Sequence, residues 1–231
     1  MAIVRGVDGC PAGWLSLSLD AEDGTPTPQV FGDTASLLCQ PGDLTAIDIP
    51  IGLASSGVRR CDEEARLLLG PRRSSVFSAP VRAALAADTY KTACEASRLA
   101  CGKALSQQSY ALLPKIRDVD DELQRVHGLS IAVREVHPEV SFYFWNGNRP
   151  MQYPKKTGFG FMERFRLVDR LWGGAATAVR NTVPRAEASD DDILDAFAAL
   201  WTARRIHAGT ATRLPAEKEI DEFGLPMHMW A

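Results

Sequence analysis

No run of apolar residues in this chain approaches the ~20 that a membrane-spanning helix needs, so no membrane partner is expected. Paired cysteines are also lacking, because the five cysteines are odd in number and contain no Cys-x-x-Cys motif. A disulfide framework or a structural zinc site is therefore not expected, and we predict a reducing, cytoplasmic location. Residues 1–9 lack a signal-peptide pattern, since an Arg and an Asp interrupt their short apolar stretch.

The chain has no excess of positive charge, and its formal net charge is −3 at pH 7. Generic, charge-driven binding of nucleic acid is therefore not expected. The charge is unevenly distributed, because residues 55–117 contain eleven Lys and Arg against five Asp and Glu. Such a basic segment in an acidic body could guide an anionic substrate to an acidic site, but an Arg-rich solvated helical surface explains it equally well.

Short β-branched or alternating apolar segments predict that the chain opens with strands, at residues 3–7, 14–19 and 29–31. The Gly- and Pro-containing turns between them favour an antiparallel meander. Residues 44–49 form a nearly continuous apolar run, which is typical of a strand buried on both faces. The other expected elements are helices at 34–39, 61–69, 89–104, 107–127, 139–145, 159–171 and 189–207, a strand at 130–136 and an edge strand at 227–230.

This order of elements predicts an α/β fold. The expected sheet is mixed, with three antiparallel strands first and parallel strands afterwards, and helices flank it. A length of 231 residues suits one large domain, so residues 1–231 are expected to form it, with a helical insertion or cap at about 55–127. Pro114 should kink or break the helix predicted at 107–127.

Acidic residues fall where the predicted core strands end. Asp8 follows the first strand, and Asp48 lies between Ile47 and Ile49 at the end of the strand 44–49. Sites in α/β proteins form at such strand ends. Crowded carboxylates repel one another unless a cation neutralises them, and Mg²⁺ prefers carboxylate oxygens. We therefore predict that Asp8 and Asp48 hold a metal ion, although a simple turn would also explain Asp8.

The helix predicted at 189–207 carries two further aspartates. Ser189 and Asp192 have the spacing of a capping box, which would give Asp192 a purely structural role. Asp195 lies one turn deeper among apolar residues, where capping does not explain it. The i,i+3 spacing allows both to face one site, and Asp195 is favoured as the third metal ligand.

The segment from Glu135 to Glu139 is the densest polar cluster. Glu135 and His137 should point to the same side of a strand, so either could bind metal, and His137 could also move protons. Glu139 is expected instead to serve the first turn of the next helix.

These features resemble the ribonuclease H-like superfamily, which has an Asp on the first strand and an acid at the end of the fourth. The late helix, Asp192-Ile-Leu-Asp195-Ala-Phe-Ala198, is similar to that of Holliday-junction resolvases. Over nearly the whole chain the sequence resembles domain-of-unknown-function family 429, which consists of predicted nucleases. The matching segments are 6–14, 47–53, 60–62, 73–77, 135–142, 192–196 and 224–227.

The resemblance implies a ribonuclease H-like fold and a divalent-metal-dependent nuclease or phosphodiesterase that uses Mg²⁺ or Mn²⁺. Asp8, Asp48 and Asp195 would bind the metal. Glu135, Asp192 and His137 would supply a further ligand or transfer protons. The substrate would be a nucleic acid or another phosphate-containing molecule. Its phosphates could be bound by guanidinium, hydroxyl and ammonium groups, which are those of Arg59, Arg60, Arg72, Arg73, Ser74, Ser75, Lys115, Lys155 and Lys156.

Two other functions fit the same residues. A phosphotransferase or ATPase of the actin-like branch of this superfold would use Gly6-Val-Asp-Gly9 as a phosphate loop, but the chain offers no second clear one. A non-catalytic binding protein that retained the fold is the other alternative. The sequence does not specify an oligomeric state, and a homodimer is compatible with it.

Overall fold

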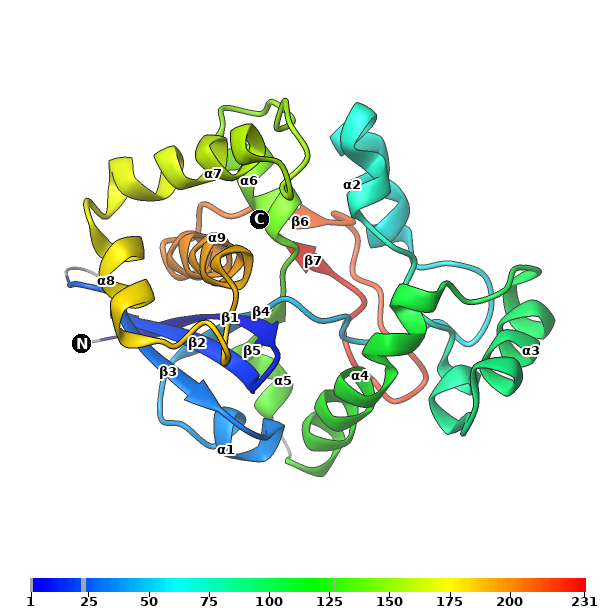
Figure 1. Cartoon of the computed structure of the whole chain (residues 1–231). Coiled ribbons are helices and arrows are strands. Elements are labelled where there is room, and N and C mark those ends of the chain that lie inside the picture. Colours follow the sequence, from blue (N-terminus) through cyan, green and yellow to red (C-terminus); the bar gives the residue numbers. More distant parts are fainter. Residues whose placement is uncertain (1, 22–23, 127) are drawn as a thin grey trace.

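A five-stranded mixed sheet forms the centre of the protein in this computed structural model, which describes residues 2–21, 24–126 and 128–231. The first three strands are antiparallel, whereas β4 runs parallel to β1 and β5 runs parallel to β4, as expected from the sequence (Figure 1). In spatial order the strands are β3 (Thr27–Phe31), β2 (Gly13–Asp20), β1 (Ile3–Cys10), β4 (Leu44–Ile47) and β5 (Val133–Glu135).

Helices cover both faces of this sheet (Figure 1). None of those in the described residues is long and apolar enough to span a membrane. In chain order the helices and 3₁₀ turns are α1 (Thr34–Leu38), α2 (Arg60–Leu69), η1 (Gly70–Ser75), η2 (Arg82–Ala86), α3 (Tyr90–Cys101), α4 (Gln107–Arg125), α5 (Leu129–Ala132), α6 (Pro138–Trp145), α7 (Gly158–Leu171), α8 (Ala175–Thr182) and α9 (Asp190–His207).

Three expectations about local structure need correction. The strand predicted at 130–136 is only three residues long, because Gly128 adopts a left-handed conformation and the chain first forms α5. Helix α4 is not broken at Pro114 but continues through it, and because Pro114 is exposed, water can replace the missing backbone hydrogen bond. The predicted helix 107–127 ends at Arg125, and residue 127 lies outside the described residues.

The C-terminal edge strand predicted at 227–230 forms, but mainly outside the central sheet. It is β7 (Met229–Trp230), which pairs antiparallel with β6 (Arg213–Leu214). A single bridge joins Trp230 to Val136, just beyond the end of β5. Helix α8 was not expected from the sequence.

Helix α9 lies directly on strand β1. A Cβ atom added to Gly6 would come within 2.0 Å of the Leu200 backbone nitrogen and 2.4 Å of the Ala196 carbonyl oxygen. Only glycine therefore allows the two backbones to approach this closely. The contact fixes the position of the aspartates on α9 relative to β1.

The helical block between β4 and β5 is more than a cover over the sheet. Ile116 and Val119 of α4 are fully buried and pack in one cluster with Val7 and Ile47 of the sheet. This α4 surface therefore belongs to the core on the face opposite α9. Whether the segment 55–127 is an insertion stays a prediction.

Candidate functional site

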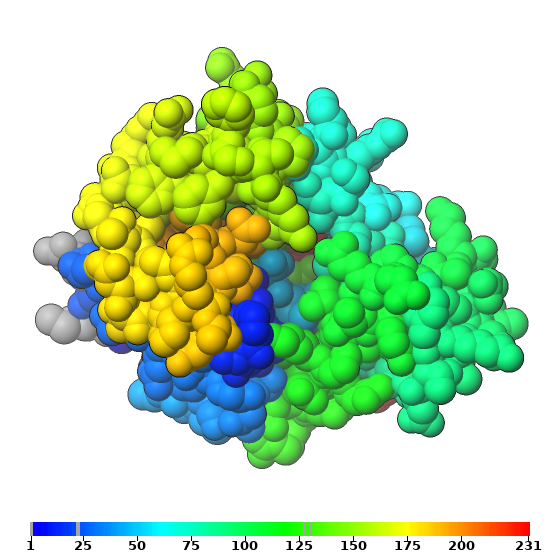
Figure 2. Space-filling model, viewed as in Figure 1, coloured from blue at the N-terminus to red at the C-terminus, as the bar shows by residue number. Residues whose placement is uncertain are grey.

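A pocket of about 360 Å³ opens at the carboxyl ends of β1 and β4. Figure 2 shows the hollow between the N-terminal strands (blue), α4 (green) and the start of α9 (orange). Nine of the fifteen site residues predicted from the sequence line it: Asp8, Asp48, Ser74, Ser75, Lys115, His137, Lys155, Asp192 and Asp195.

The alternation of side chains along two strands directs Asp8 and Asp48 to the same face. Gly6 faces α9, so Asp8, two residues further along β1, points to the α9 side as well. Gly6 pairs with Ala46 in the parallel β1–β4 ladder, and Asp48 lies two residues beyond Ala46. The backbone N–H of Asp48 donates to the Val7 carbonyl oxygen at 2.9 Å, which continues the ladder beside Asp8.

Helix α9 brings two more aspartates to this end of the sheet. The predicted capping box is confirmed: the Ser189 N–H donates to Asp192 Oδ2 at 2.7 Å, and the Asp192 N–H donates to Ser189 Oγ at 3.2 Å. Asp192 therefore caps the helix and also lines the pocket. Asp195 is 5% exposed and lies deeper on the face that packs against β1.

These carboxylates disfavour one another's charge. Burial raises the pKa of Asp8 well above its usual range, and the charges of Asp195, Asp48 and Asp192 raise it further. Burial raises the pKa of Asp48 to about 6, with Asp195 adding to the rise while His137 and Lys155 oppose it. Such a cluster favours any cation that can enter the pocket.

Lys155 is one of two lysines that line this pocket, and it pairs directly with an aspartate. Its Nζ donates to Asp195 Oδ2 at 2.6 Å, and the charge of Asp195 raises the pKa of Lys155. The Lys155 side chain is 40% exposed. The ammonium therefore has a route to solvent.

Lys115 and His137, which also line the pocket, contact backbone carbonyl oxygens. Lys115 Nζ donates to the carbonyl oxygens of Cys10 (3.1 Å) and Gly13 at the β1–β2 turn, and it lies 4.6 Å from the centre of the Trp14 ring. His137 Nε2 lies 3.3 Å from the Ser75 carbonyl oxygen. Because a carbonyl can only accept, Nε2 carries a proton in this contact, and the buried Nδ1 is left without a protein partner among the described residues.

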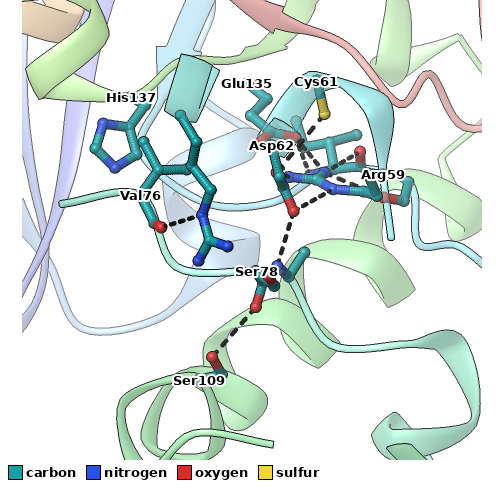
Figure 3. A network of polar contacts seen from close by, with 12 residues as sticks. Arg59, Cys61, Asp62, Val76, Ser78, Ser109, Glu135 and His137 are labelled. Carbon is teal, nitrogen blue, oxygen red and sulfur yellow. Dashed lines mark hydrogen bonds and ion pairs between the residues drawn. The ribbon is translucent and has the colours of Figure 1, made fainter. Parts of the chain in front are cut away.

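Glu135 and Arg59 do not reach this pocket, contrary to expectation. Glu135 pairs in register with Ile47, and Ile47 with Val7, so its side chain lies on the face opposite Asp8. Arg59 is 3% exposed and donates to both Glu135 oxygens at 2.7 Å, as Figure 3 shows. His137, expected to share a side with Glu135, lies apart from this network because the strand ends at Glu135.

Arg59 also explains why a second cluster of possible metal ligands needs no metal. Cys61, Asp62 and Glu135 have ligand atoms within 4.8 Å of one another, and no other group of three in the described part of the chain meets that distance. Asp62 accepts from Arg59 Nη2 at 2.6 Å, and burial raises the pKa of the Cys61 thiol well above its usual range. The guanidinium supplies the positive charge there, whereas the acids of the pocket are spaced more widely.

Arg60 and Arg73 face other parts of the surface. Arg60 pairs with Glu217 at 2.9 Å and with Glu219 at 3.2 Å. Arg73 lines a separate depression beside Glu63. Neither residue lines the pocket.

Glu139 is an acid of the pocket that the sequence did not predict to be there. Glu139 was expected to serve only the first turn of its helix, yet it is 5% exposed and lines the pocket. Its buried surroundings come from α7, which the local sequence around Glu139 does not reveal.

Comparison with known proteins identifies a family without an assigned activity. No curated protein and no solved structure matches the chain. The family model described as protein of unknown function (DUF429) matches residues 6–220, which include the strands of the central sheet from Gly6 onwards and all of α9. The chain therefore belongs to the DUF429 family.

Proposed function

We propose that this protein is a divalent-metal-dependent phosphodiesterase with a ribonuclease H-like fold, and that its substrate is a nucleic acid. The observation that carries the proposal is the convergence of four aspartates, from β1, from the end of β4 and from α9, on one pocket. The raised pKa values of Asp8 and Asp48 support it, because they reflect carboxylates that are buried and, in addition, lie close to other carboxylates.

The donor set fits a hard cation. Carboxylate oxygens are the ligands that Mg²⁺ and Mn²⁺ prefer, and Asp8, Asp48 and Asp195 would hold the ion. Bound there, such an ion supplies Lewis-acid polarisation of a phosphoryl oxygen and lowers the pKa of water. Lys155, now paired with Asp195, can leave through its exposed side.

Other residues of the pocket suit a phosphodiester. Lys115, Ser74 and Ser75 line the same cavity and offer an ammonium and two hydroxyls to phosphate oxygens. His137 Nδ1 has no protein partner among the described residues, so it would be the atom that exchanges a proton with a substrate or water. The sheet, with three antiparallel strands followed by parallel ones, is the arrangement that the ribonuclease H-like resemblance implies, although a fold alone does not assign a function.

The proposal is tested with metal-depleted protein incubated with single-stranded, duplex and branched DNA and with RNA, with and without Mg²⁺ or Mn²⁺. We expect metal-dependent cleavage of at least one substrate, reduced about 100-fold or more in Asp8→Asn. The matched control is Asp88→Asn, which alters an exposed aspartate outside the pocket and should cleave like the wild type.

Two results would overturn the proposal: no metal-dependent cleavage of any substrate by the wild type, or equal cleavage by Asp8→Asn. Stabilisation by ATP without cleavage would favour the phosphotransferase alternative.

A further inference from the structure

Glu139 occupies a position that capping of its own helix does not explain. It is the second residue of α6, after Pro138, and α6 has no side-chain hydrogen bond at its N-terminus. The carboxylate is buried at 5% exposure, whereas an acid that serves only the helix dipole can remain in water. It lines the same pocket as Asp8 and Asp195.

One oxygen of this carboxylate is held by Arg164 of α7. Arg164 Nε donates to Glu139 Oε1 at 2.8 Å, and Nη2 donates to the same oxygen. Arg164 is itself 1% exposed, and its Nη1 donates to the Gly160 carbonyl oxygen at 2.7 Å. Because the guanidinium is itself held in place, it fixes the orientation of the Glu139 carboxylate.

The second oxygen, Oε2, has no hydrogen-bond partner among the described residues. It forms an ion pair with Arg72 Nε, but the two atoms lie 3.8 Å apart, which is beyond hydrogen-bond range. Buried carboxylate oxygens are normally paired, because an unpaired one loses its hydration without replacement. The missing partner of Oε2 is therefore to be sought in the pocket that Glu139 lines.

We infer that Glu139 is a further ligand of the divalent cation in this pocket, with Arg164 holding Oε1 so that Oε2 faces the ion. This inference rests on the proposed metal site. It assigns a role to an acid that follows β5, in addition to the acids of β1, β4 and α9.

The test is the affinity of the full chain for Mn²⁺, measured by isothermal titration calorimetry, together with the metal-induced rise in Tm. Glu139→Gln keeps an amide oxygen for Arg164 but removes the charge. We expect its Mn²⁺ affinity to fall about tenfold or more and the metal-induced rise in Tm to shrink.

Glu163→Gln is the matched control. Glu163 lies next to Arg164 on α7, but its oxygens accept the N–H groups of Gln152 (2.8 Å) and Tyr153 (3.2 Å), and it does not line the pocket. Its Mn²⁺ affinity should stay within about twofold of the wild type. Unchanged Mn²⁺ affinity in Glu139→Gln would overturn the inference, since a purely structural Glu139 would alter only the Tm without metal.

A wild-type crystal soaked in Mn²⁺ tests the same point without a variant that must fold. Anomalous density within ~2.3 Å of Glu139 Oε2 is expected, and density bound to Asp8 but remote from Glu139 contradicts the inference. If the wild type binds no Mn²⁺, both proposals fail. If Mn²⁺ affinity depends on Glu139 but no substrate is cleaved, only the proposed function fails.

Discussion

The guanidinium of Arg59 lies between two buried carboxylates, those of Asp62 and Glu135, and bonds to both. The backbone N–H groups of Ile51 and Ala79 complete the set by donating to Glu135 at 2.7 Å and to Asp62 at 2.9 Å. At the scale of single residues this network is a structural joint between α2 and β5. It is separate from the chemistry of the pocket.

Removing the charge of Arg59 should therefore affect folding rather than metal binding. In Arg59→Met two buried carboxylates lose their partner, and the free energy of unfolding should fall by about 3–5 kcal/mol in urea denaturation. Arg60→Met is the control, because the ion pairs of Arg60 are exposed to water and their loss should leave the free energy of unfolding close to that of the wild type. Equal losses in the two variants would contradict this account of the network.

Lys155 is expected to compete with a metal ion for Asp195. Lys155→Met removes the resident positive charge, so Mn²⁺ affinity should rise about tenfold while the Tm without metal falls. Lys156→Met, at the exposed neighbouring position, should change neither quantity appreciably. Calorimetric titration of both variants decides, and weaker Mn²⁺ binding in Lys155→Met would show that Lys155 does not oppose the ion.

At the scale of elements, the contact between β1 and α9 sets the distance between the acids they carry. Gly6→Val would force a side chain into the α9 backbone, which cannot move aside as a side chain can. The free energy of unfolding should fall by about 3 kcal/mol or more, and metal binding should be lost in any folded fraction.

Gly32→Ala provides the comparison for Gly6, because an added Cβ there would meet nothing within 4 Å. Its free energy of unfolding should change by less than about 1 kcal/mol. The pair of urea denaturation curves tests whether close packing, rather than glycine itself, matters at Gly6.

The sequence predicted the elements better than it predicted which faces they present. Asp8, Asp48 and Asp195 lie in one pocket as expected, because alternation along β1 and β4 and the burial of α9 can be inferred from local pattern. Glu135 was misplaced because its side depends on the register of β5 with β4, a non-local quantity. The sequence did not place Glu139 in the pocket, because its partner Arg164 is 25 residues away in the chain.

At the scale of the whole molecule, the raised pKa values of the buried aspartates should make the protein more stable at lower pH when divalent ions are absent. Asp48 has a pKa of about 6 in the folded protein against a usual value of 3.8, so the folded state takes up the proton first. Protonation of Asp48 therefore adds to the free energy of unfolding; this stabilisation is complete below about pH 3.8 and is lost as the pH rises through 6.

The wild type should therefore gain about 1–2 kcal/mol in free energy of unfolding relative to Asp48→Asn when the pH is lowered from 7.5 to 5 in EDTA. Urea denaturation at several pH values measures this difference directly, and general effects of pH cancel between the two proteins. If the difference between the two proteins does not vary with pH, the pKa of Asp48 is not raised in the folded protein.

The packing of α9 on β1 also has a consequence for folding during synthesis. Asp8 belongs to the first strand, but Asp192 and Asp195 lie in α9, about 180 residues later in the chain. A chain that is still being synthesised contains β1 without the helix that covers Gly6, so two of the five acids that line the pocket have not yet been added. The pocket can form only after residues 190–207 have left the ribosome, so a shorter nascent chain cannot contain it.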